Sequence, residues 1–165
     1  MKVLNIHERV LNAPIALVGK LIDGLASPDD KLWPHDHWNA MKFDRPLSIG
    51  AAGGHGPIRY FAEAYAPGRN IRFRFTGPKG FLGSHAFEIE EISKDKTRLR
   101  HVIDMRVMGW ARLQWPLMIR SLHDALLEDA LDRAEIFIGG QPAPRHWSFW
   151  VRLLRKVLKR GRPAK

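Results

Sequence analysis

Three histidines of this sequence are placed where an imidazole could do chemistry. His85 and His101 each alternate with apolar residues in segments of strand-like period, and His123 shares helical spacing with Ile119 and Leu126. An imidazole on an apolar face can exchange a proton near neutral pH or orient a polar group of a bound ligand. A buried histidine that simply hydrogen-bonds to a neighbour gives the same pattern, and the sequence leaves both interpretations open.

The distance between His85 and His101 depends on how their strands pair. The two strands are predicted to form a hairpin that turns near Asp95. That turn places Ile89 opposite His101 and Met105 opposite His85. The two histidines are therefore predicted to lie two layers apart on one face.

Two charged residues share the helix that carries His123. The adjacent Asp124 is not expected to pair with His123, because consecutive helical residues do not face each other. Arg133 lies on the apolar side of the same helix. It could form an ion pair with Asp129, four residues earlier, or it could anchor an acidic ligand, and the ion pair is the more ordinary interpretation.

Other motifs are weaker. His55 lies in a Gly-Gly-His-Gly-Pro turn that lacks the Lys-Ser/Thr of a phosphate loop and leads into a strand, so we expect it at most near the mouth of a cavity. The His35-Asp36-His37 run offers two histidines without a third ligand, so we predict neither a metal nor a cofactor. The chain has no cysteine, which excludes thiol nucleophiles and cysteine metal sites.

These side chains need a scaffold, and the segment that organises it is a predicted helix from Pro116 to about Ile138. At 3.6 residues per turn, its apolar side gathers Ile119, Leu122, His123, Leu126, Ala130, Arg133, Ala134 and Phe137. The opposite side gathers Ser121, Asp124, Glu128, Asp132 and Glu135. A helix this amphipathic must bury its apolar stripe against something large. We therefore predict a curved antiparallel sheet that grips the helix, with a cavity between them.

The block before this helix reads as strands with one early helix. A strand is predicted at 3–11, where Ile6 and Val10 alternate with His7 and Arg9. A helix follows from Pro14 to about Leu25, and a short helical turn after Pro28. Further strands are predicted at 47–52, 58–65, 71–75, 84–92 and 97–107.

The formal net charge of +10 is a local feature of the end of the chain. Eight of the 27 basic residues lie in the last 21 positions, where there is no acid, so the rest of the chain is nearly neutral. We predict a ligand-binding domain at 1–138, a Gly/Pro linker at 139–146, and a basic amphipathic helix with its tail at 147–165.

The basic helix, predicted at 147–160, has three possible partners. It could lie on an anionic membrane surface, pack on its own domain or on a second copy in a homo-oligomer, or bind nucleic acid. Nucleic acid is disfavoured, because no second basic patch or base-reading element accompanies the helix. The start of the chain is too polar for a signal peptide and no apolar run could span a bilayer, so we expect a cytoplasmic protein, with membrane association through the tail left open.

Three passages together resemble the helix-grip fold of the START-like (SRPBCC) superfamily, which includes the pollen-allergen type and the polyketide cyclase and dehydratase type. They are NAPIALVGKLID after a first strand, the meander from GGHGPIRY to LRHVIDM, and the closing helix PLMIRSLHDALLEDALDRAEIF. The resemblance covers roughly residues 3 to 138. It implies an α+β domain that holds a hydrophobic ligand between sheet and long helix.

We predict that the protein binds or carries a hydrophobic or amphiphilic small molecule. The alternative is a cyclase- or dehydratase-like enzyme in which His101 or His123 is the general acid or base. The predicted ligand-binding residues are His55, His85, His101, Met105, Trp110, Trp115, Ile119, His123, Leu126 and Arg133.

Overall fold

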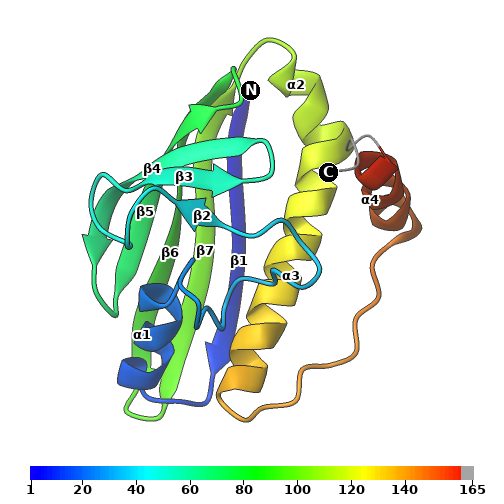
Figure 1. Ribbon diagram of the computed structural model, residues 1–165. Coiled ribbons are helices and arrows are strands. Elements are labelled where there is room, and N and C mark those ends of the chain that lie inside the picture. The colour runs from blue at the N-terminus through cyan, green and yellow to red at the C-terminus, as the bar shows by residue number, and fades with distance from the viewer. Residues whose placement is uncertain (161–165) are drawn as a thin grey trace.

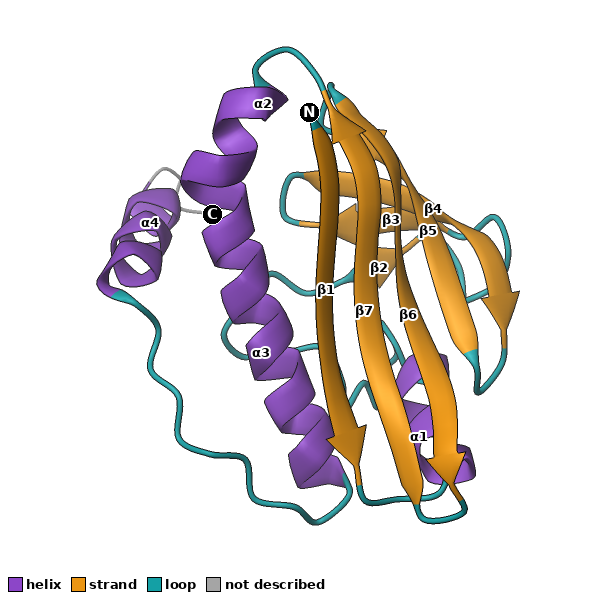
Figure 2. Ribbon diagram, turned by 180° about the vertical axis from the view of Figure 1, so that it is seen from behind, coloured by secondary structure: helices purple, strands orange, loops and turns teal. Residues whose placement is uncertain are grey.

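A single antiparallel sheet of seven strands forms one layer of the protein, in the spatial order β1-β7-β6-β5-β4-β3-β2 (Figure 1). The computed structural model describes residues 1–160. The strands are β1 (Lys2–Leu11), β2 (Lys42–Phe43), β3 (Ala52–His55), β4 (Ile58–Ala66), β5 (Asn70–Gly77), β6 (Phe81–Ser93) and β7 (Lys96–Val107). The sheet curves around one long helix, which is the predicted helix-grip arrangement (Figure 2).

The long helix begins earlier than the sequence predicts. It runs without a break through α2 (Ala111–Gln114), a π-helical turn η1 (Trp115–Ile119) and α3 (Arg120–Phe137). Pro116 lacks an N–H and cannot complete the regular hydrogen-bond ladder. The N–H of Arg120 instead bonds the carbonyl of Trp115, five residues back, and this widened turn lets the helix continue.

The buried stripe of α3 is rotated from the predicted one. It consists of Leu126, Leu127, Ala130, Leu131 and Ala134, so the prediction missed Leu127 and Leu131. The acids Asp124, Glu128, Asp132 and Glu135, predicted to face solvent, contact β1 instead. The helix lies over the sheet beside its edge strand β1, so β1 covers the flank on which these acids lie.

Strand β1 presents the opposite face to the helix from the one its apolar residues suggest. Ile6 and Val10 are each 48% exposed, whereas His7 and Arg9 point toward α3. His7 lies directly opposite His101 of β7 in the ladder, and residues directly opposite share a face of the sheet. The register with β7 thus places His7 inside.

The β6–β7 hairpin also differs from the predicted register. Phe87, not Ile89, lies opposite His101, and Ile103, not Met105, lies opposite His85. A register irregularity between Glu91 and Ser93, next to the turn, accompanies the observed pairing. The shift of two residues keeps every side chain on its predicted face but brings His85 and His101 into diagonal contact.

Other local predictions need correction. Residues 47–50 form bends and turns rather than a strand, and His55 belongs to β3 rather than to a turn. The segment after Pro28 forms turns without a helix, while the early helix α1 spans Ile15–Asp23. The C-terminal helix α4 spans Phe149–Arg160, and residues 161–165 of the predicted tail lie outside the described residues. Within residues 1–160, no helix has both the length and the apolar character to cross a membrane.

Candidate functional site

A row of aromatic rings crosses the interior between the sheet and α3. The Nδ1 of His55 lies 3.0 Å from the hydroxyl of Tyr60, whose ring centroid is 4.7 Å from that of His85. The Nδ1 of His85 lies 3.2 Å from the Nε2 of His101. The His101 ring is 5.1 Å from that of His123 on α3, and the His123 ring is 5.9 Å from that of His7 on β1. These six residues are called the histidine row below: His55, Tyr60, His85, His101, His123 and His7.

The contact between His85 and His101 leaves unpaired groups whichever tautomer forms. One nitrogen of the close pair must carry the proton and the other must accept it. The outer nitrogens, Nε2 of His85 and Nδ1 of His101, then comprise one N–H donor and one acceptor. Both outer nitrogens are buried and neither has a protein partner among the described residues. The pair therefore offers a donor and an acceptor to a guest molecule.

His7 ends the row in a cluster of carboxylates. Its Nδ1 lies 2.9 Å from Glu128 Oε1 and its Nε2 lies 3.1 Å from Asp124 Oδ1. Asn5 Nδ2 also donates to Asp124 Oδ1, at 3.0 Å. His123 Nδ1 lies 3.6 Å from the same oxygen, closer than the sequence argument allowed, although beyond hydrogen-bonding distance. The hydrogen bond with His7 thus holds the Asp124 carboxylate beside the ring of His123.

The protonation states differ along the row. Burial lowers the pKa of His55 to about 3 and holds the pKa values of His85 and His101 well below the usual range. Burial also lowers the pKa of His123, although the Asp124 carboxylate opposes it. For His7, burial is outweighed by the hydrogen bonds to Asp124 and Glu128, and its pKa is raised. The row thus has neutral imidazoles in the interior at neutral pH, and the protonated form is favoured at its outer end, where both nitrogens of His7 face carboxylate oxygens.

The histidine row separates two apolar clusters. On β7, His101 lies between Leu99 of the larger cluster and Ile103 of the smaller one. On the long helix, His123 of α3 lies between Leu126 of the larger cluster and Ile119 of η1, which packs on the smaller one. The smaller cluster comprises Val3, Phe81, Ile103, Met105, Val107, Ala111 and Trp115. A molecule at this layer would meet polar nitrogens in the middle and apolar walls above and below.

The structure gathers most of the predicted site residues around this layer. Met105 and Trp115 are buried in the smaller cluster, beside the row. Trp110 is 78% exposed and stands outside it. Arg133 does not form the predicted ion pair with Asp129. It donates to Asp36 at 3.1 Å, because the loop before β2 reaches across to α3.

Sequence reasoning missed three members of this region: Asn5, His7 and Tyr60. Tyr60 is almost fully buried in β4, and Asn5 and His7 face inward from β1. The alternation of polar and apolar residues in β1 was visible, but alternation alone did not say that the set with Asn5 and His7 faces the interior. The even spacing of Asn5 and His7 was the available signal.

One group in the described part of the chain has donor atoms close enough to hold a metal ion. One ligand atom each from His7, His123 and Asp124 lie within 4.8 Å of one another. Two imidazoles and a carboxylate suit a divalent transition metal. Both nitrogens of His7 already face carboxylates, however, so an ion there would have to displace the proton that these hydrogen bonds favour.

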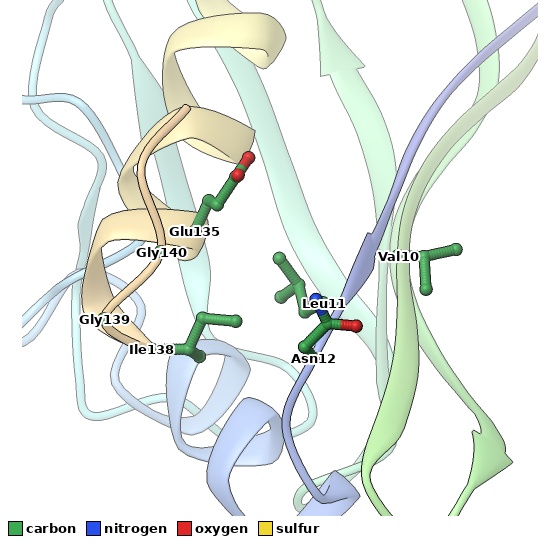
Figure 3. Close-up of a pocket in the computed structure, with 7 residues that line it drawn as sticks. All are labelled: Val10, Leu11, Asn12, Glu135, Ile138, Gly139 and Gly140. Carbon is green, nitrogen blue, oxygen red and sulfur yellow. The ribbon is translucent and has the colours of Figure 1, made fainter. Parts of the chain in front are cut away.

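Two hollows stand out among the described residues, and neither lies at the histidine row. One, of about 260 Å³, lies between the end of β1 and the C-terminal end of α3, where Leu11 and Ile138 point inward and Val10 points away (Figure 3). The other, of about 250 Å³, lies beside Trp147 and Arg152. Around the histidine row the interior holds large, fully buried side chains, among them Tyr60, Phe73 and Phe87.

No known family profile matches this sequence, and no curated protein is significantly similar to it. Solved structures do share its fold. CalU16 from Micromonospora echinospora has a TM-score of 0.59 at 16% identity, covering 95% of this chain and 91% of that one. Norcoclaurine synthase from Thalictrum flavum, in complex with dopamine and hydroxybenzaldehyde, has a TM-score of 0.63 at 12% sequence identity. The match covers 87% of this chain and 90% of that one. A START superfamily protein from Mycobacterium smegmatis has a TM-score of 0.58 at 12% sequence identity. The match covers 82% of this chain and 97% of that one.

Proposed function

We propose that this protein, which has the START-like helix-grip fold, binds a small molecule with an apolar body and a hydrogen-bonding group. The observation that carries the proposal is a set of buried polar atoms in one layer that have no hydrogen-bond partner among residues 1–160. They are Asn5 Oδ1, His85 Nε2, His101 Nδ1 and His123 Nδ1. Each such atom costs about 1–3 kcal/mol while unpaired, so a ligand that pairs with several of them gains binding energy there.

The apolar walls beside the row would hold the body of the ligand. Burial of apolar surface stabilises a complex by roughly 25 cal/mol per Å². Because the interior is packed, a ligand needs an opening, and η1 is the natural place for one. Trp115 of this π turn closes the smaller cluster, and π turns within helices are frequent at functional sites. We infer that α2 and η1 move away from the sheet to admit the ligand.

A structural neighbour supports the ligand class. Norcoclaurine synthase was solved with dopamine and hydroxybenzaldehyde, which are small molecules with an aromatic body and polar groups. A ligand of that general chemistry fits a layer that offers both donors and acceptors between apolar walls.

The second candidate function is an enzyme of the cyclase or dehydratase type. One observation favours it: His123, kept neutral by burial, lies 3.6 Å from the Asp124 carboxylate. A neutral imidazole beside a carboxylate can act as a general base and stabilise the charge it then acquires. A catalytic His123 would accept a proton from a carbon or hydroxyl next to a carbonyl of the ligand.

Two measurements test the binding proposal. Native mass spectrometry of the freshly purified full chain should show an extra mass that is released on denaturation as an apolar small molecule. After the co-purifying molecule has been removed, the fluorescent probe anilinonaphthalene sulfonate should bind the protein. The variant His101→Phe should weaken probe binding at least tenfold, which corresponds to about 1.4 kcal/mol of binding free energy. His146→Gln, at an exposed histidine outside the row, is the matched control and should bind as the wild type does.

A clean apo mass together with no probe binding would refute the proposal, as would equal probe affinity in His101→Phe. The enzyme alternative is separated by His123→Gln once the co-purifying compound is known. An enzyme loses turnover of that compound and keeps its affinity, whereas a carrier shows no turnover in either form.

A further inference from the structure

Large apolar side chains are exposed at the N-cap of α2, within α2 and within η1. Trp110 is 78% exposed, Leu113 52% and Leu117 63%. Their spacing, i, i+3 and i+7, places all three on one face of the continuous helix. Single exposed apolar residues are ordinary, but three large ones in a row on one face indicate a surface that something else covers.

Helix α4 exposes a second apolar row. Phe149 is 73% exposed, Leu153 39% and Val157 59%, at a spacing of four that again defines one face. Val151, in contrast, is buried against the domain. The apolar residues of this predicted amphipathic helix therefore lie on two sides. Val151 packs against the domain, and the row that begins at Phe149 is exposed to solvent.

The helices that carry the two apolar rows are in contact. Trp150 of α4 donates from Nε1 to the backbone carbonyl of Leu117 in η1 at 2.9 Å. Figures 1 and 2 both show α4 beside the upper part of the long helix. The orientation of α4 is fixed on its inner side by Arg155, whose guanidinium lies over the rings of Trp38 and Trp147 at 4.2 and 4.0 Å. We call the combined exposed face the α2–α4 surface. Its members are Trp110, Leu113, Leu117, Phe149, Trp150, Leu153 and Val157.

The charges on these segments have one sign. Neither 105–123 nor 136–165 contains an aspartate or glutamate. Arg112, Arg152 and Lys156 are exposed on the same helices as the apolar rows. Arg120 is exposed as well and lies 3.6 Å from Asp124, the first acid after η1. The surface thus combines exposed tryptophan, phenylalanine and leucine with exposed cations on segments whose sequence contains no acid.

We propose that the α2–α4 surface docks this protein on the surface of an anionic lipid bilayer. Apolar and aromatic side chains can enter the boundary between headgroups and acyl chains, where tryptophan is favoured, while the cations contact lipid phosphates. A second copy of the same surface would bring like charges together, and nucleic acid would leave the apolar row uncovered. Docking of this kind does not depend on the ligand-binding function proposed above.

Vesicle co-sedimentation of the full chain tests the proposal. Vesicles of phosphatidylcholine with phosphatidylglycerol should bind the protein, and vesicles of phosphatidylcholine alone should bind it at least tenfold more weakly. The double variant Phe149→Ser, Leu153→Ser should lose at least tenfold in partitioning. The matched control Leu4→Ser, Ile6→Ser removes exposed apolar side chains from the far face of β1 and should bind as the wild type does.

A charge variant tests the electrostatic part. Arg152→Gln with Lys156→Gln should weaken binding to anionic vesicles by about thirtyfold, from about a factor of five per cation near the surface. The control Lys94→Gln with Lys96→Gln removes the same two charges at the exposed β6–β7 turn. It should weaken vesicle binding only by the small effect of the lower net charge of the protein.

Several results would overturn the proposal. They are no wild-type binding to anionic vesicles, full binding by the Phe149 and Leu153 variant, or an equal loss in the Leu4 and Ile6 control. Light scattering provides a further check. A dimer that the Phe149 and Leu153 variant abolishes, without vesicle binding by the wild type, would assign the surface to self-association instead.

Discussion

Mild acid should destabilise this protein strongly, because its interior holds imidazoles that the native state keeps neutral. His85 and His101 are buried and His55 is half-buried, and the pKa values of all three are lowered by burial. The unfolded chain binds a proton at each of them once the pH falls below about 6.5, and the native chain does not. More protons are then bound by the unfolded state, so the free energy of unfolding falls as the pH falls.

The size of the effect follows from linkage. Between about pH 7.5 and about pH 5.5, each group that titrates only in the unfolded state removes about 1.4 kcal/mol of stability. Three such groups together remove about 4 kcal/mol, a large part of the roughly 5–15 kcal/mol typical of a domain. His7 acts in the opposite sense: its pKa is raised, so its stabilisation is fully present below about pH 6.5 and is lost as the pH rises through its folded pKa.

Urea unfolding followed by tryptophan fluorescence at the two pH values measures this difference. The variant His85→Phe, which replaces one imidazole among aromatic neighbours, should reduce the pH-dependent loss by about 1.4 kcal/mol, whatever it does to absolute stability. Leu4→Ser, at an exposed position without a titrating group, should leave the loss unchanged. A loss below about 1 kcal/mol in the wild type, or an unaltered loss in His85→Phe, would refute the description of the row as neutral and buried.

Two further substitutions test the elements that position the site. Arg9→Gln breaks a half-buried network of ion pairs with α3, including a 2.8 Å contact to Asp132, and should lower the free energy of unfolding by about 2 kcal/mol in urea titration. Arg74→Gln, in an exposed pair, should cost less than about 0.5 kcal/mol, and equal losses would contradict the argument. Gly83→Ala should lower the free energy of unfolding by about 3 kcal/mol. A Cβ at this position would lie 2.3 Å from the Asp104 carbonyl oxygen, and the φ of Gly83 is +151°. An unchanged melting temperature would show that the β6–β7 pairing is not as described.

The histidine row conflicts with the ordinary rules for a core. Buried polar groups are usually paired, yet His85, His101 and His123 each keep one buried nitrogen that has no partner in the described part of the chain. An apolar residue at any of these positions would avoid that cost. Sequences that break a local rule in this way tend to do so at functional sites, which is why the row, rather than either surface hollow, is the centre of the proposed function.

The separate pieces of the scaffold could be anticipated because each leaves a periodic signal. The long helix showed a period of 3.6 and the strands a period of two, so His101 and His123 were correctly expected on the inward sides of β7 and α3. Period alone cannot say which of two alternating sets faces the core when both contain polar residues. In β1 the apolar Ile6 lies outside and His7 inside, because α3 supplies carboxylates that Asn5, His7 and Arg9 pair with and Ile6 cannot.

By itself the sequence determined the fold class, the long helix, the inward placement of three histidines and the concentration of positive charge in the last 21 residues. These depend on local periodicity and composition. The tertiary structure decided the rest: the tighter hairpin that brings His85 to His101, the inward turn of His7, and the seat of α4 beside η1. Each of these is set by contacts between residues far apart in the chain, where a shift of one or two positions costs little in local energy but changes every neighbour.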